Sequence, residues 1–377
     1  QQTEEKYKAL KNNFFKRGIL IGGMSGLLYG VYSAFLTLGM SRGIWADWQA
    51  PGSGLSVFIL TYMLSAIGSS INDTISGLFS LANVTAKGKL KDFLRTMRTK
   101  PGWIMVLAAL FGGPLANTAY VIGLQMAGSM AAPVSALCVA IGALLGRILY
   151  KQTLNLRMAA GIVLCFAATV MIGGTALSAM NSQVLLGCAI SFIAALGWGI
   201  EGCVAGHGTA LIDSEIGITI RQCTSGIVNT LVLVPLFAVL AGNITLAPQL
   251  LGQAWSSAGA MPFFVISGFC AMLTFSMWYK GTSMCGAALG MALNGTYSFF
   301  TPLCCWILLG LIFREPGWAI TPIGWVSALV MFCGIVLIAM DPRQLFQKKS
   351  TQKQNLIRHG KNTNKIREAH SFWRNIF

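Results

Sequence analysis

Long apolar stretches alternate with short polar or charged connections along most of the chain. Ten of these stretches reach the roughly 20 residues that a helix needs to cross a bilayer. They lie at residues 18–40, 54–83, 102–125, 129–149, 156–179, 183–206, 217–241, 260–280, 283–311 and 320–340. Because several connections are very short, neighbouring helices are expected to be antiparallel. The pattern predicts an all-α integral membrane protein with ten transmembrane helices, an N-terminal segment at 1–17 and a basic tail at 342–377.

Composition and charge support a membrane protein and argue against a nucleic-acid partner. Of the 377 residues, 55% are hydrophobic and 10% are charged, which is unlike a soluble domain. The net charge is +16, but 23 of the 27 Lys and Arg lie in four segments outside the predicted spans, at 1–17, 84–101, 147–157 and 343–377. These segments share one side of the predicted bundle. The positive-inside rule therefore places both termini in the cytoplasm, and contact of the basic tail with anionic lipid remains an alternative use of its charge.

Two similar patterns recur half a chain apart. Residues 123–128 read GLQMAG and residues 281–286 read GTSMCG, and each is followed by Leu-Leu-Gly, a charged linker and a glycine-punctuated span. Spans three to five therefore resemble spans eight to ten. With five spans in each half, the second copy must have the opposite membrane orientation. The sequence predicts inverted five-helix repeats at 18–179 and 180–341, an architecture of transporters with the substrate near the repeat interface.

Two acidic residues, Asp73 and Glu201, lie well inside predicted spans. A carboxylate in hydrocarbon is costly and is by default a candidate functional group. Trp198 precedes Glu201 by three residues, so the two share a helix face, and a negative charge beside a π-face suits an organic cation. A structural carboxylate bonded to a neighbouring helix is the alternative for Glu201. Asp73 lies among serines at helical spacing, which fits a polar packing seam as well as a coupling or gating role.

Further polar and aromatic residues on the span faces are candidates for substrate binding. Asn117 with Tyr120 and Asn294 with Tyr297 are i, i+3 pairs in opposite halves of the chain, and Tyr29 lies in the first span. A buried Asn needs hydrogen-bond partners, which favours a site at these pairs. Each aromatic residue could instead anchor the chain at the membrane interface.

Two residues at span ends are expected to mark the membrane boundary. Tyr279 lies between Trp278 and Lys280, as an interfacial anchor would. Arg221 lies near the start of the seventh span and most simply marks its inner boundary, although it could pair with Asp213 or Glu215.

No catalytic or cofactor-binding motif is visible. The chain contains no P-loop, HExxH or GxSxG sequence. Its ten cysteines all fall in apolar spans without a Cys-x-x-Cys pair, so they are expected to be small core residues and not ligands of a metal. We therefore expect no enzyme activity, no metal and no cofactor.

Several segments carry a resemblance to a known family. The sequence GSMAAP at 128–133 opens the fourth span, and the linker-plus-glycine pattern occurs in both halves. Over residues 18–341 the chain resembles the drug/metabolite transporter (DMT/EamA) superfamily in its ten-helix form. Segments 112–129, 197–226 and 293–300 are similar to bacterial choline permeases of that superfamily.

The resemblance implies a function and a site. It implies a secondary transporter in the bacterial plasma membrane that takes up choline or another quaternary ammonium compound by alternating access. It also implies an aromatic cage with a carboxylate at Trp198 and Glu201, and Tyr29 stands where that family tends to place a Trp. Two alternatives stay open: an exporter of amino acids or other small metabolites, and a membrane scaffold or an enzyme without a recognisable motif.

Overall fold

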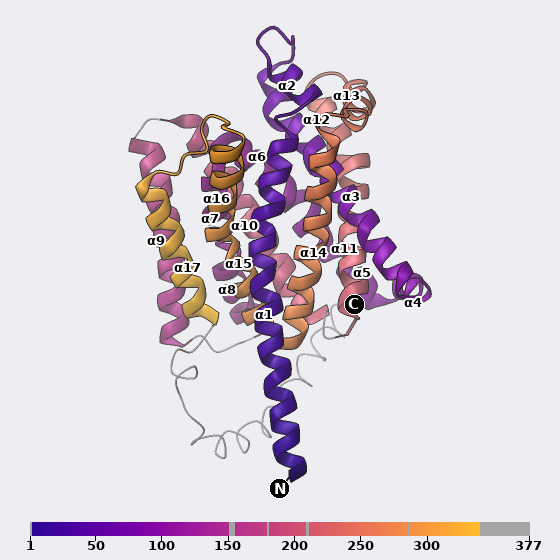
Figure 1. Cartoon of the computed structure of the whole chain (residues 1–377), viewed down its shortest axis with the longest axis vertical. Coiled ribbons are helices and arrows are strands. Elements are labelled where there is room, and N and C mark those ends of the chain that lie inside the picture. The colour runs from indigo at the N-terminus through magenta and orange to yellow at the C-terminus, as the bar shows by residue number, and fades with distance from the viewer. Residues whose placement is uncertain (1, 151–154, 179–180, 209–210, 286, 340–377) are drawn as a thin grey trace.

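The computed structural model describes residues 2–150, 155–178, 181–208, 211–285 and 287–339, and every regular element within these ranges is helical. The helices lie side by side in one bundle, with α1 (Gln2–Gly39) running along it and extending beyond one end (Figure 1). The predicted segment 1–17 is thus mostly a continuation of the first helix. The predicted tail at 342–377 lies outside the described residues.

Helical elements cover each of the ten apolar stretches. In the first half they are α1, η1 (Ile59–Met63) with α3 (Leu64–Ala86), α5 (Lys100–Leu110) with η2 (Phe111–Leu115) and α6 (Ala116–Ala127), η3 (Gly128–Met130) with α7 (Ala131–Ser135) and α8 (Cys138–Tyr150), and α9 (Leu156–Ser178). In the second half they are α10 (Ser182–Gly208), α11 (Ser214–Val228) with η4 (Asn229–Leu233) and α12 (Val234–Leu240), α14 (Met261–Cys285), α15 (Ala287–Gly295) with α16 (Tyr297–Cys305) and η5 (Trp306–Ile312), and α17 (Pro322–Ala339). The connections hold α2 (Ile44–Gln49), α4 (Leu90–Thr96) and α13 (Leu246–Trp255).

Six helical stretches among the described residues are long and apolar enough to cross a membrane. They are Asn13–Gly39, Lys100–Ser135, Ser182–Ala205, Ser214–Leu240, Met261–Met284 and Leu289–Ile312. The apolar helices Cys138–Leu149, Leu156–Met171 and Pro322–Ile338 are shorter. The helix α3 is continuous, but buried serine, asparagine and aspartate side chains interrupt the apolar run of its sequence. Length and composition therefore define a multi-pass, all-α membrane protein. By these two criteria alone, six of the ten predicted spans are long and apolar enough to cross a membrane.

The pairing of helices follows a regular scheme. The first apolar stretch (α1) packs against the eighth (α14), and the sixth (α10) packs against the third (α6). The first also packs against the ninth (α15 and α16), as the sixth packs against the fourth (α7 and α8). The second pairs with the seventh and the fifth with the tenth. Exchanging the two halves leaves this scheme unchanged.

Breaks in two of the apolar stretches meet inside the bundle. In the fourth stretch α7 ends at Ser135 and α8 begins at Cys138, and in the ninth stretch α15 ends at Gly295 and α16 begins at Tyr297. The Ser135 and Tyr297 hydroxyls share a hydrogen bond of 3.0 Å. The side chains at these two breaks are thereby brought together from opposite halves of the chain.

Candidate functional site

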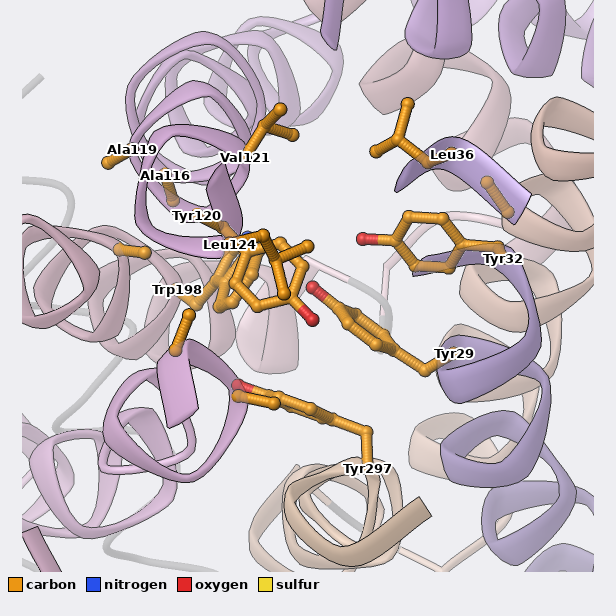
Figure 2. Close-up of a cluster of buried hydrophobic side chains, with 14 of the residues drawn as sticks. Tyr29, Tyr32, Leu36, Ala116, Ala119, Tyr120, Val121, Leu124, Trp198 and Tyr297 are labelled. Carbon is orange, nitrogen blue, oxygen red and sulfur yellow. The ribbon is translucent and has the colours of Figure 1, made fainter. Parts of the chain in front are cut away.

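Four predicted aromatic residues meet in one buried cluster (Figure 2). Tyr29 of α1 stacks on Tyr297 of α16 with ring centroids 4.1 Å apart and an interplanar angle of 22°. Trp198 of α10 meets Tyr29 edge-on at 5.8 Å, and Tyr120 of α6 lies 5.3 Å from Trp198. The four side chains thus come from the first, third, sixth and ninth apolar stretches.

A small cavity adjoins this cluster. Its walls come from helices of both halves, and its lining comprises Tyr29, Cys138, Trp198, Phe275, Trp278, Met291, Asn294 and Tyr297. The cavity volume is about 10 Å³, which is room for about one water molecule, whereas ligand pockets usually span ~300–1,000 Å³. The cavity beside the stacked rings of Tyr29 and Tyr297 is therefore too small in this structure for a ligand of ordinary size.

Glu201 is held by an ion pair with Arg221 of the neighbouring helix α11. The Arg221 Nε donates to Glu201 Oε1 at 3.0 Å, and both side chains are fully buried. The expectation that Arg221 marks the membrane boundary is therefore wrong. Asp213 and Glu215, its suggested partners, instead pair with lysines of the connection between α3 and α4, with Lys89 contacting both carboxylates at 2.8–2.9 Å. Arg221 is the eighth residue of α11, about two turns from the start of the helix, and at that depth its side chain is already buried in the packed bundle.

The carbonyl of Gly112 joins the ion pair to the aromatic cluster. It accepts hydrogen bonds from Trp198 Nε1 at 2.8 Å and from Arg221 Nη2 at 2.9 Å. Gly112 lies in the π-helical segment η2, and a Cβ at this position would lie 1.6 Å from Glu201 Oε2. Glycine is therefore required for this close approach. The Arg221 guanidinium also lies 4.0 Å from the centroid of the Phe275 ring, a cation–π contact.

Tyr279 completes the surroundings of Glu201. Its hydroxyl donates to Glu201 Oε1 at 3.2 Å, and its side chain is buried. The expectation of an interfacial anchor is therefore wrong for Tyr279, although its neighbour Lys280 is exposed. Adjacent residues point in directions about 100° apart on a helix. A single aromatic residue near a span end therefore cannot be assigned to lipid or core without knowing the packing.

Asp73 is buried among neutral hydrogen-bond donors. Asn117 Nδ2 donates to both of its oxygens at 3.0 and 3.1 Å, Asn229 Nδ2 donates at 2.9 Å, and Asn72 Nδ2 donates at 3.3 Å. The Ser225 hydroxyl donates to the same carboxylate. Four neutral partners satisfy the carboxylate without a cation in direct contact with it.

Asn117 connects this carboxylate to the ion pair. While its amide nitrogen donates to Asp73, its Oδ1 accepts from Arg221 Nη2 at 3.3 Å. Asp73, Glu201 and Arg221 therefore belong to one hydrogen-bonded network, which we call the charged network. It contains two acids and one base, so its formal charge is −1 when all three groups are ionised.

The predicted site residues thus divide into two adjoining groups. The cluster and cavity contain Tyr29, Tyr120, Trp198, Asn294 and Tyr297, whereas the charged network contains Asp73, Asn117 and Glu201. Asn294 lines the cavity and accepts a hydrogen bond from Ser25 Oγ at 3.1 Å. Each Asn-x-x-Tyr pair therefore supplies a tyrosine to the cluster, but Asn117 faces the charged network.

Sequence reasoning missed several residues of the site. Arg221, Ser225 and Asn229 follow one another at intervals of four residues, and this polar stripe on one helix face could have been found. Phe275 and Trp278 gave no such signal, because aromatic residues in a membrane span are common. Among the described residues, no group of three or more His, Cys, Asp or Glu side chains could hold a metal ion.

Comparison with known proteins supports a shared fold. No family model matches the sequence, and no curated protein matches it. A solved structure described as "Crystal structure of protein" aligns with a TM-score of 0.50 and 17% sequence identity, covering 86% of this chain and 98% of its own. At that identity the likeness concerns the fold alone.

Proposed function

We propose that this protein is a secondary transporter that moves a small organic cation across the membrane by alternating access. Choline or a related quaternary ammonium compound is the proposed substrate. The observation that carries the proposal is the juxtaposition of an aromatic-lined cavity with a buried charged network of two acids and one base. A permanent cation needs no hydrogen-bond acceptor for its charged group. Its binding is instead favoured by the π-faces of aromatic rings and by nearby negative charge.

The architecture supports transport. We propose that the ten helical stretches are ten membrane spans, arranged as inverted repeats at 18–179 and 180–341. The helix pairing that is unchanged on exchange of the two halves favours this arrangement. Broken helices at equivalent positions of two halves are typical of transporter binding sites, and the breaks before Cys138 and Tyr297 adjoin the cavity.

Micromolar binding of an organic cation requires several aromatic rings together with one net negative charge. A cation–π contact contributes ~0.5–2 kcal/mol, whereas micromolar binding requires about −8 kcal/mol. Because Arg221 already neutralises one acid of the charged network, the unbalanced charge corresponds formally to Asp73. An inside-negative membrane potential adds about 2.3 kcal/mol per charge per 100 mV. With both termini in the cytoplasm of a bacterial plasma membrane, as the basic segments favour, the potential alone would drive uptake.

Arg221 raises a second candidate, the export of an amino acid or another anionic metabolite. A buried arginine is well suited to binding a carboxylate. Here, however, its three nitrogens already contact Glu201, Gln222, Gly112 and Asn117. Export of an anion would require Arg221 to exchange partners during transport.

Calorimetric binding with the purified protein tests the proposal, followed by uptake into proteoliposomes that hold an inside-negative potential. Choline, betaine, polyamines and amino acids serve as ligands. Trp198→Ala should abolish choline binding, whereas the matched change Trp103→Ala, at a tryptophan that is 63% exposed, should preserve it. Equal binding by both variants would show that the site is elsewhere.

The remaining outcomes separate the functional classes. Saturable binding of a neutral or anionic metabolite without choline binding would favour the exporter. No flux of any tested solute would favour a membrane scaffold or an enzyme.

A further inference from the structure

The side chain of Met291 is enclosed by three helices beside the aromatic cavity. It lines the cavity together with Cys138 of α8, Trp198 of α10 and Asn294 of its own helix α15. These three helices pack against one another in every pair. Because Met291 is buried, its thioether belongs to the interior of the bundle and does not face lipid.

Met291 rests against two glycines that leave room for it. A Cβ built at Gly142 of α8 would lie 2.7 Å from the Met291 Cε. A Cβ built at Gly202 of α10 would lie nearer still to the same methyl group and to the sulfur. The thioether therefore occupies the space that side chains at both glycine positions would fill, and we call this space the Met291 seat.

The Met291 seat lies one helical turn beyond the cavity lining. On α8, Gly142 follows the cavity residue Cys138 by four residues. On α10, Gly202 follows Trp198 by the same interval, and a turn of α-helix holds 3.6 residues. Figure 1 shows α8 and α15 nearer than α7 and α16 to the end of the bundle from which the N-terminal part of α1 extends. Met291 therefore separates the cavity from that end.

We infer that Met291 is a gate residue that closes the cavity toward this end of the bundle, and that Gly142 and Gly202 form its seat. A methionine side chain is unbranched and has three rotatable bonds, so it can leave and re-enter the seat without a movement of the backbone. The two glycines present no Cβ to obstruct that rotation. Under the proposed alternating access, displacement of Met291 would open the cavity to one side of the membrane. The closure itself does not depend on which solute the protein moves.

The thiol of Cys138 reports whether the cavity is open, because it lines the cavity and is buried. The purified full-length protein is treated with aminoethyl methanethiosulfonate, a small cationic thiol reagent. Mass spectrometry of the Cys138 peptide gives the rate of modification. The wild-type protein should react slowly. Met291→Ala should react about tenfold faster or more, because a buried group reacts in proportion to the population of the open state.

Met331→Ala is the matched control, because Met331 is fully buried in α17 and does not line the cavity. It removes the same side chain from the interior, and the rate at Cys138 should stay at the wild-type value. In the Met291→Ala background, Gly202→Leu should restore slow modification, because the leucine fills the seat from α10. Gly142→Leu fills the seat from α8 and serves as the second test if the first double variant does not fold.

Three results would overturn the inference. They are equal rates for the wild-type protein and Met291→Ala, an equal increase in Met331→Ala, or continued fast modification in the refilled variants that fold. None of them bears on cation binding, so the proposed function would stand. The expected rates together with a lack of binding by every tested cation would overturn the proposed function and leave the gate in place.

Discussion

Arg221 on α11 reaches Glu201 on α10 through an Nε–Oε1 hydrogen bond of 3.0 Å, and neither side chain is accessible to solvent. Removing one partner of a buried ion pair leaves an uncompensated charge and typically costs about 3–5 kcal/mol. We expect Glu201→Gln or Arg221→Met to lower stability by this amount. The double variant should be more stable than Arg221→Met alone. Thermal unfolding in detergent, followed by circular dichroism, measures the coupling.

The pair formed by Lys89 and Asp213 provides the control for this cycle. Its side chains are 34% and 41% exposed, and exposed ion pairs contribute about 0–1 kcal/mol. Lys89→Met with Asp213→Asn should therefore show little coupling. Equal coupling in the two cycles would contradict the view that burial makes the Arg221–Glu201 pair the stronger one.

Gly112→Ala should disrupt the site by sterics alone. The added Cβ would lie 1.6 Å from Glu201 Oε2, so the carboxylate or the π-helical segment would have to move. Overpacking in a dense interior costs about 1–3 kcal/mol, and displacement of Glu201 would add part of the cost of breaking the ion pair. We expect a lower unfolding midpoint, measured as above, together with weakened choline binding if the proposed function holds.

Gly23→Ala is the matched control within a long helix. Nothing lies within 4 Å of a Cβ built at Gly23, and alanine is favoured over glycine in a helix by ~0.5–1 kcal/mol. This variant should be as stable as the wild-type protein or slightly more stable. A loss of stability at Gly23 equal to that at Gly112 would show that close approach to Glu201 is not the cause.

The positions of the helices could be read from the sequence because a bilayer-length apolar run is a strong local signal. The sequence predicts Trp198, Tyr29, Tyr120 and Tyr297 as candidate site residues on separate helices, and the structure brings them together. Their stacking could not be predicted, because it depends on contacts between helices far apart in the chain. The role of Arg221 could not be predicted either, because its depth depends on how α11 packs and not on its position in the span.

The ion pairs between the α3–α4 connection and the start of α11 should make stability depend on pH. Burial is the largest influence on Glu215 and raises its pKa, but hydrogen bonds from Lys87 and Lys89 together outweigh it and leave the pKa below its ordinary value. Burial also raises the pKa of Asp213, but the hydrogen bond from Lys89 and those from backbone amides outweigh it, so this pKa too lies below its ordinary value. A depressed carboxylate pKa contributes stability above the ordinary value of about 4, which is lost as pH falls through the folded-state pKa.

Unfolding midpoints between pH 6 and pH 3 test this expectation. Asp213→Asn with Glu215→Gln should remove part of the acid sensitivity, by about 1 kcal/mol or less because the lysines are partly exposed. Raising the salt concentration should have a similar effect on the wild-type protein, since salt screens surface charges. An unchanged pH profile in the double variant would show that these ion pairs do not contribute.

Asp73→Asn should distinguish the contribution of the site's negative charge to ligand binding from the contribution of its shape. The change removes one acid from the charged network and leaves Glu201 balanced by Arg221, so the formal charge rises from −1 to zero. Asn117, Asn229 and Ser225 can still bond the remaining oxygen, and we expect a fold cost of about 1–3 kcal/mol.

Under the proposed function, Asp73→Asn should weaken choline binding about tenfold, which corresponds to ~1.4 kcal/mol. The matched ligand is 3,3-dimethylbutanol, the uncharged carbon analogue of choline, whose affinity should not change because it has no charge for the network to attract. Titration of both ligands against wild-type and variant protein gives the comparison. Equal losses for the two ligands would mean that Asp73 maintains the cavity shape, and no loss for either would mean that its charge does not act on the cavity. A loss confined to choline would assign the attraction to the unbalanced acid, since Arg221 and Glu201 remain paired in both proteins.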